Sequence, residues 1–272
     1  EGVSRIQKLQ MATQEGANVS VCAIKGNFDD AQTAVKRIFT SKEAAEEIEK
    51  HALFFSSANS INWGRLAPQI VYYISAYCDM VKAGTIAMGD RMNVTVPTGN
   101  FGNILAAYIA KKMGLPIGKL VCASNCNNIL TDFFTKGVYD RRRPFYTTTS
   151  PSMDILISSN LERLLYLSMG AEKCKSLMES LNKDGVYSVS EEQRAAFAVD
   201  FAAGYCSEQE TAQTIKAYFD KGYLCDPHTA VALYCADEYV KASGDNAPML
   251  VASTASPYKF PQAVLTALGL NL

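Results

Sequence analysis

No stretch of about twenty consecutive apolar residues occurs in this sequence, so no segment is expected to span a bilayer. The longest apolar run, from Leu66 to Cys78, is short and is interrupted by Pro68, Gln69 and Ser75. The chain begins with Glu1 rather than Met, and its first residues lack the apolar core of a signal peptide. We therefore expect it to be a processed or cut part of something longer, with no membrane partner.

An excess of charge of either sign is also absent. The 26 basic residues nearly balance the 27 acidic ones, which gives a formal net charge of −1. A nucleic-acid-binding protein needs a basic face to displace counterions from phosphates, so no nucleic-acid partner is expected. Because 48% of the residues are hydrophobic and only 19% are charged, disorder is excluded as well. The composition is that of a globular protein, more typical of an enzyme or enzyme part than of a scaffold.

Metal ligands and disulfide patterns are scarce. Only two histidines are present, His51 and His228, and the eight cysteines are scattered without a C-x-x-C pair. A zinc site and a disulfide framework are therefore poorly supported, and we expect no metal. Buried, reduced thiols in a cytoplasmic protein are the expected state of the cysteines. No Ser/His/Asp triad or paired-carboxylate signature is evident.

Strand and helix signals alternate along the middle of the chain. Residues 93–96 predict a strand, residues 104–113 a helix that ends at Gly114-Leu115-Pro116, and residues 119–123 a second strand. A strand, helix and strand with short connections are typical of a parallel sheet, so an α/β fold is predicted. Other expected elements are a strand over 19–24, a turn at Gly26-Asn27, a helix capped by Asp29-Asp30, helices over 153–169, 191–203, 209–221 and 229–239 (the last capped by Asp226), a strand over 249–252 and a helix from Pro261.

One compositional break divides the chain. A charged, Glu-rich helix is expected over Ser41 to Lys50, and the polar segment Ser56 to Ser60 follows it. We place a boundary near residue 52, with a small αβ piece at 1–52 and a larger α/β domain at 53–272.

The most informative segment runs from Val94 to Asn103, between an expected strand and an expected helix. The N–H groups at a helix start are unpaired, and the helix dipole is positive there. Gly99 and Gly102 allow the backbone to approach a ligand closely, and the neighbouring Thr and Asn side chains add neutral donors. These features suit a phosphate. The pattern is neither G-x-G-x-x-G nor a Walker loop, and a βα turn that binds nothing is slightly favoured by this segment alone.

A polar cluster precedes the long apolar run. It contains Asn59, Ser60, Asn62 and Arg65. In one interpretation Asn62 or Ser60 caps a helix and Arg65 lies on a solvated face. In the other, the cluster forms an anion or amino-acid pocket in which Arg65 makes bidentate contacts.

Three further segments are ambiguous. Ser253 to Ser256 follows the last expected strand, and ligands of parallel sheets bind beyond the carboxyl ends of strands, where a hydroxyl could hydrogen-bond a ring nitrogen without protonating it. His228 lies in a first helical turn, where an ordinary polar residue is a simpler interpretation than a general base. Arg141-Arg142-Arg143 is expected to be a solvated loop, with a local anion contact as the alternative.

Seven motifs, in order along the chain, resemble those of the threonine synthase family. Each is weakly specific alone, but the combination is highly specific. The motifs are Ile24 to Gln32, Asn59 to Trp63, Pro97 to Asn103, Ser150 to Ile155, Ser158 to Arg163, Asp226 to Ala230 and Thr254 to Phe260.

The resemblance implies a fold-type II pyridoxal-phosphate enzyme, with a parallel-sheet large domain flanked by helices and the remaining part of a smaller domain. It also implies conversion of O-phospho-L-homoserine and water to L-threonine and phosphate. Thr254 is implied to face the pyridine nitrogen, where a neutral partner moderates the electron sink. The family's loop for the cofactor phosphate corresponds to Gly99, Asn100, Phe101, Gly102 and Asn103. As a further hypothesis, Asn59, Ser60, Asn62 and Arg65 help to hold the substrate.

One departure concerns the family's Schiff-base lysine, which lies in a Phe-Lys-Asp motif that this chain lacks. Lys25 and Lys259 fall in matching motifs but do not correspond to it. We therefore assign no catalytic residue here, expect that lysine upstream of this chain, and expect no turnover from the chain alone.

Two alternatives to threonine synthase stay open. One is a threonine-synthase-like phospho-lyase that acts on a related phosphorylated amino acid. The other is a non-catalytic α/β module that binds phosphate. The sequence also leaves the oligomeric state open between monomer and homodimer.

Overall fold

The computed structural model describes residues 5–26 and 28–271. The chain divides into two compact units, one that ends at Ala58 and one that begins at Asn59. The assignment of residues 1–52 to a small αβ domain and of 53–272 to a large one stays a prediction.

The regular elements described in the first unit are helices. Its helices are α1 (Arg5–Ala12), α2 (Phe28–Thr40) and α3 (Lys42–Glu49), with the side chain of Ser41 capping α3. The predicted strand over 19–24 is wrong, because these residues lie outside any helix or strand. A strand needs a neighbour for its N–H and C=O groups, and the described residues of this unit provide none.

The helix that was expected to be capped by Asp29-Asp30 starts earlier than predicted. That helix begins at Phe28, so Asp29 and Asp30 belong to its first turn rather than preceding it. Asn27 of the predicted turn lies outside the described residues.

The second unit is built on a parallel sheet. Its strands are β1 (Met92–Pro97), β2 (Ile117–Ser124), β5 (Phe201–Tyr205) and β6 (Met249–Val251), in the order β5-β2-β1-β6. All three pairings are parallel. The predicted α/β fold with a parallel sheet flanked by helices is confirmed.

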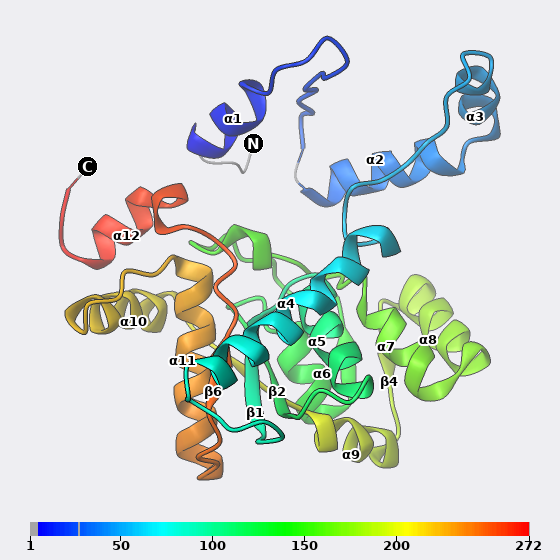
Figure 1. Cartoon of the computed structure of the whole chain (residues 1–272). Helices are drawn as coiled ribbons and strands as arrows, with labels where there is room; N and C mark the ends of the chain where they lie inside the picture. The colour runs from blue at the N-terminus through cyan, green and yellow to red at the C-terminus, as the bar shows by residue number, and fades with distance from the viewer. Residues whose placement is uncertain (1–4, 27, 272) are drawn as a thin grey trace. The chain divides into compact units, whose positions relative to one another are not determined.

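Both faces of the sheet are covered. Along β2, Leu120 and Cys122 pack in the core formed with α4 (Trp63–Lys82) and α5 (Gly102–Lys112). The alternate residues Val121 and Ala123 pack with α11 (Pro227–Ser243), drawn in orange in Figure 1. The alternation follows from the two-residue period of a strand. Because both faces are buried, β1 is apolar or uncharged and buried throughout.

The remaining elements complete this unit. They are α6 (Ile129–Lys136), β3 (Val138–Asp140), the 3-10 turn η1 (Pro151–Met153), α7 (Leu161–Met169), α8 (Ala171–Asp184), β4 (Val186–Ser188), α9 (Glu191–Asp200), α10 (Glu208–Asp220), the 3-10 turn η2 (Pro257–Lys259) and α12 (Pro261–Ala267). Strands β3 and β4 pair antiparallel in a separate two-stranded sheet. No helix within residues 5–26 and 28–271 is long and apolar enough to cross a membrane.

Two predicted helices are too long. The helix expected over 191–203 ends at Asp200, and the chain continues as β5 because Phe201 and its neighbours pair with β2. The helix expected over 153–169 is reduced to η1 and α7, and residues 154–160 are not helical. In both cases a long-range contact overrides the local helical pattern.

Candidate functional site

The loop Thr98–Phe101 connects the carboxyl end of β1 to the start of α5. The run Val94-Thr95-Val96 favours a strand because its side chains are β-branched. After Pro97, the N–H of Thr98 still donates to the carbonyl of Ala123 at 2.8 Å, while its hydroxyl donates to the carbonyl of Val96 at 2.7 Å. Both donors of Thr98 are thus used within the protein, and any donors left for a ligand begin at Gly99.

Phe101 fixes the shape of this loop. Its φ of 63° is in the left-handed region, which costs a non-glycine residue about 1–3 kcal/mol. The residue is 1% exposed, and its ring packs against both Phe134 and Phe201, with centroid distances of 5.9 Å to each. Burial of a ring of this size offsets the cost. Phe101, a predicted cofactor-binding residue, can therefore offer only its backbone to a ligand.

The carbonyl groups of the loop are held by the segment before α7. The hydroxyl of Ser158 donates to the carbonyl of Gly99 at 2.8 Å. The backbone N–H and the side-chain amide of Asn160 both donate to the carbonyl of Asn100 at 3.0 Å. These contacts also explain why residues 154–160 are not helical, since the segment serves the loop instead.

The N–H groups of the loop are, in contrast, available. Within the described part of the chain, no hydrogen bond is made by the N–H groups of Gly99, Asn100, Phe101, Gly102 or Asn103. Gly102 and Asn103 are the first residues of α5, where the helix dipole is positive. A run of donors without acceptors at a helix start is suited to an anion such as a phosphate.

The two glycines have a packing role that the sequence analysis did not foresee. A β-carbon on Gly99 would lie 2.7 Å from the carbonyl oxygen of Ser152, and one on Gly102 would lie 3.1 Å from Cβ of Ser60. Both missing side chains thus face protein atoms. The glycines allow close approach of other segments of the chain, and a ligand would be met by the N–H groups.

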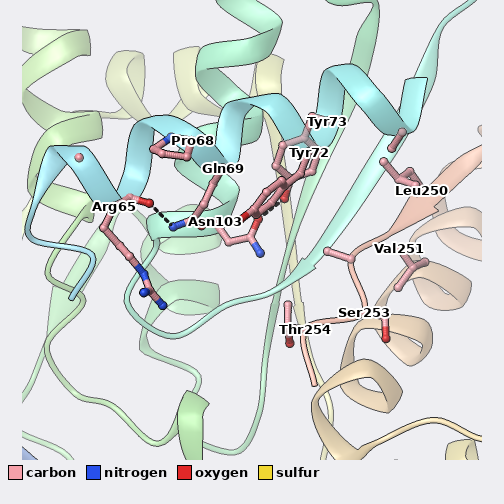
Figure 2. A pocket seen from close by; sticks show the side chains of 13 residues that line it. Arg65, Pro68, Gln69, Tyr72, Tyr73, Asn103, Leu250, Val251, Ser253 and Thr254 are labelled. Atoms are coloured by element: carbon pink, nitrogen blue, oxygen red, sulfur yellow. Dashed lines mark hydrogen bonds between the residues drawn. The ribbon is translucent and has the colours of Figure 1, made fainter. Parts of the chain in front are cut away.

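A cavity of about 700 Å³ lies in the second unit (Figure 2). It brings together three segments that are distant in sequence, which are residues 64–76 of α4, the start of α5, and the end of β6 with the residues after it. The lining residues are Gly64, Arg65, Pro68, Gln69, Tyr72, Tyr73, Ala76, Asn103, Leu250, Val251, Ala252, Ser253 and Thr254. None of these described residues is a lysine.

Asn103 belongs to both the loop and the cavity. The Tyr73 hydroxyl donates to Oδ1 of Asn103. Burial raises the pKa of Tyr73, so the phenol stays protonated and remains a donor. Figure 2 shows the amide nitrogen of Asn103 turned into the open space, with Thr254 on the opposite side. The predicted residues Asn103 and Thr254 thus line the same cavity.

Tyr73, Tyr72 and Gln69 are lining residues that the sequence analysis missed. They belong to the longest apolar run, from Leu66 to Cys78, which the sequence analysis considered only as a possible membrane span. Gln69 is a polar residue in that run, four positions after Arg65, and residues at this spacing share one face of a helix. Its side chain donates to the carbonyl of Arg65 at 3.0 Å. The four-residue spacing from Arg65 could therefore have predicted that Gln69 lies on the same face of the helix as Arg65.

The four predicted substrate-binding residues have different surroundings. Asn62 is the N-cap of α4, and its side chain accepts from the N–H of Gly64 at 2.9 Å. Asn59 accepts from the N–H of Ile61 at 2.8 Å. Ser60 accepts from the side chain of Asn160 at 3.0 Å. Arg65 is the member of this group whose side chain lines the cavity.

Two arginines of the ambiguous run Arg141-Arg142-Arg143 pair with carboxylates. Arg143 donates to Asp132 at 2.7 Å and to the side chain of Asn128 at 3.0 Å. Arg142 makes a bidentate pair with Asp140 at 2.9 and 3.0 Å. Arg142 stays exposed despite this pair, as expected of a solvated loop, whereas Arg143 is half-buried beside Asp132.

Comparison with known proteins also indicates similarity to threonine synthases. A family model described as "Threonine synthase, C-terminal" matches residues 229–271. Human threonine synthase-like 1 is 43% identical over 275 residues, which cover 99% of this chain and 37% of that protein. Threonine synthase of Saccharomyces cerevisiae is 38% identical over 284 residues, which cover 98% of this chain and 54% of that protein.

The fold is similar to solved threonine synthases as well. The structure of threonine synthase from Brucella melitensis with PLP bound aligns with a TM-score of 0.86 at 44% identity, covering 98% of this chain and 55% of that one. The chain thus spans about half the length of the threonine synthases it matches and little more than a third of threonine synthase-like 1. In sequence and in fold the chain is a relative of the threonine synthases, and the resemblance indicated by its motifs is confirmed.

Proposed function

We propose that this chain forms the part of a pyridoxal-phosphate-dependent threonine synthase that binds the cofactor phosphate and contacts the cofactor ring. The complete enzyme converts O-phospho-L-homoserine and water to L-threonine and phosphate. The observation that carries the proposal is the run of five N–H groups from Gly99 to Asn103, at the start of α5, to which residues 5–26 and 28–271 supply no acceptor. The similarity to a threonine synthase whose structure holds PLP supports it.

The residues present fit this cofactor. The backbone donors at Gly99–Asn103, at the positive end of the α5 dipole, suit a phosphate. Thr254 lines the cavity beyond β6 and offers a neutral hydroxyl to a pyridine nitrogen. When bound, pyridoxal phosphate supplies an electron sink for the substrate carbon next to the amino group. A neutral partner at the ring nitrogen moderates that sink.

The chain's own residues would also orient the substrate. Arg65 lines the cavity and carries a planar guanidinium that suits a phosphate ester. Asn59, Ser60 and Asn62 precede Arg65, and their hydrogen bonds fix the start of α4 from which Arg65 extends. The amide nitrogen of Asn103, held by Tyr73, is a further donor toward the cavity.

No residue of this chain is assigned to the covalent chemistry. Since the lining of the cavity contains no lysine among the described residues, we propose that the Schiff-base lysine comes from a polypeptide segment outside these 272 residues. We further propose the fold-type II arrangement, in which residues 1–52 belong to the small domain, and a cytoplasmic enzyme. All eight cysteines are free, as a reducing compartment requires.

Two preparations test the proposal. The chain alone should bind pyridoxal phosphate with a change in cofactor absorbance and should form no threonine. The complete gene product should form threonine and inorganic phosphate from O-phospho-L-homoserine. Threonine formation by the chain alone would overturn the lysine assignment, and failure of both preparations to bind the cofactor would overturn the proposed function.

A second candidate is a threonine-synthase-like phospho-lyase acting on a related phosphorylated amino acid. Its support is the 43% identity to human threonine synthase-like 1 over nearly the whole chain. Product analysis separates the two candidates. Release of phosphate without threonine, from the complete gene product given O-phospho-L-homoserine or a phosphorylated analogue, favours the second.

A further inference from the structure

Asp226 is a buried carboxylate outside the cavity, at the start of α11. It is 0% exposed, and its side chain caps the helix by accepting from the N–H of His228 at 2.9 Å. Burial acts to raise the pKa of Asp226, but hydrogen bonds from His228 and Thr229 outweigh it and hold that pKa below its ordinary value. The group is therefore a charged acceptor, with more partners than a helix cap needs.

The first arm of this network leads to the loop at Gly99. The Nδ1 atom of His228 lies 2.8 Å from Asp226, and its Nε2 atom accepts from the N–H of Ser152 at 3.2 Å. A backbone N–H can only donate, so Nε2 carries no proton and Nδ1 donates to Asp226. Ser152 belongs to η1, and the carbonyl oxygen of Ser152 lies against Gly99. His228 thus holds the turn that supports the loop.

The second arm leads to the residue next to Thr254. The hydroxyl of Thr229 donates to the other oxygen of Asp226. It lies 3.2 Å from the hydroxyl of Ser253, and since its own proton is used, it accepts from Ser253. Thr229 is 1% exposed, whereas Ser253 and Thr254 line the cavity.

We propose that Asp226 is a positioning residue that connects the two ends of the cofactor site. Through His228 and Ser152 it sets the loop that meets the phosphate. Through Thr229 and Ser253 it sets the strand end that carries Thr254. This inference rests on the proposed function for the identity of the ligand, but the connection itself consists of hydrogen bonds within the chain.

Binding measurements on the whole chain separate the two arms. The probes are pyridoxal phosphate and inorganic phosphate. His228→Asn leaves the N–H of Ser152 without an acceptor and should weaken the binding of both probes by roughly tenfold. His228→Gln, with an oxygen near the Nε2 position, should retain most of the affinity. Thr229→Val should weaken pyridoxal phosphate and alter its absorbance spectrum without affecting inorganic phosphate, and Thr229→Ser should restore both.

Amide hydrogen exchange of the unliganded chain provides the readout that needs no ligand. His228→Asn should speed exchange at residues 99–103 and 151–153, and Thr229→Val at 252–255. Asp226→Asn should speed exchange in both segments. If that variant does not fold, His228→Asn and Thr229→Val still test the inference. Ser207→Ala, which removes the N-cap of α10 elsewhere in the unit, is the matched control and should change neither.

The outcomes are distinguishable. Exchange that changes only in the first turn of α11, or arm variants that behave like Ser207→Ala, would overturn the inference. If the wild-type chain binds neither probe, the proposed function fails, and the exchange data still decide whether Asp226 connects the two segments.

Discussion

The carbonyl oxygen of Ser152 lies 2.7 Å from the position that a β-carbon on Gly99 would occupy. The contact is with backbone, which has little freedom to move away. A glycine at position 99 is therefore required by the packing of one loop against another. The same contact places η1 directly against the loop whose N–H groups are available to a ligand.

Gly99→Ala should consequently cost about 1–3 kcal/mol of unfolding free energy, as overpacking does in well-packed interiors. Affinity for pyridoxal phosphate should fall as well, because the displaced loop carries the N–H donors. Gly102→Ala should cost less, since its β-carbon would meet a side-chain carbon at 3.1 Å. Urea denaturation and cofactor titration measure both effects. Gly204→Ala, whose β-carbon would make ordinary contact with Cys235 at 3.5 Å, is the control. Equal effects at positions 99 and 204 would contradict the packing interpretation.

Tyr73→Phe should release the side chain of Asn103. The lost hydrogen bond should cost about 1 kcal/mol of stability, and the affinity for pyridoxal phosphate should fall several-fold because Asn103 is no longer oriented. Tyr77, one turn later in α4, accepts from the N–H of Gly89 at 2.8 Å, and it does not line the cavity. Tyr77→Phe therefore removes the same atom from the same helix and should affect stability only. Cofactor titration that fails to distinguish the two variants would remove Tyr73 from the site.

Arg65→Ala tests the proposed contact to the substrate phosphate. Arg65 is exposed, so the unfolding free energy should change by no more than about 0.5 kcal/mol. In the complete gene product, KM for O-phospho-L-homoserine should rise about tenfold or more, which corresponds to loss of a charge-assisted hydrogen bond. Lys82→Ala removes a positive charge from the last turn of the same helix and should leave KM unchanged. An Arg65→Ala enzyme with unaltered KM and kcat would exclude Arg65 from substrate binding.

Asp132 should make the second unit sensitive to acid. Burial acts to raise its pKa, and hydrogen bonds from Lys136 and Arg143 outweigh it, so the folded-state pKa lies below the ordinary value of 3.8. The stabilisation is thus fully present above that value and is lost as the pH falls through the lowered pKa.

Asp132→Asn should accordingly lower stability at pH 7 by about 1–2 kcal/mol and flatten the acid limb of the stability curve. Chemical denaturation at several pH values from about 2 to about 7, the range over which carboxylates titrate, would measure the free energy of unfolding. Asp79→Asn removes a charge from the exposed surface of α4 and is the control. An unchanged acid limb in Asp132→Asn would show that the ion pairs contribute nothing.

Much of the central fold could be predicted from local pattern. The β-branched run before Pro97, the helix after Gly102 and the strand ending near Ala123 were all anticipated close to their observed bounds. The N-cap at Asp226 was anticipated too. Strand alternation and helix capping depend on neighbouring residues, so they can be read without knowing the rest of the fold.

The misassigned segments share a cause. Phe201 continues a helical pattern, yet it pairs with Leu120 in the sheet. Ser158 and Asn160 lie in a stretch that was expected to be helical, yet they bind the carbonyls of Gly99 and Asn100. In each case the deciding partner is distant in sequence, where local periodicity carries no information.

By itself, then, the sequence determined the parallel α/β core and the position of the loop with available N–H groups, because both follow from local periodicity and glycine placement. Only the tertiary structure decided that the loop's carbonyls are occupied while its N–H groups are available, that Tyr73 orients Asn103, and that Asp226 has partners leading toward both ends of the site. Hydrogen bonds between distant segments need a particular distance and direction, and only the packing of the whole unit establishes these.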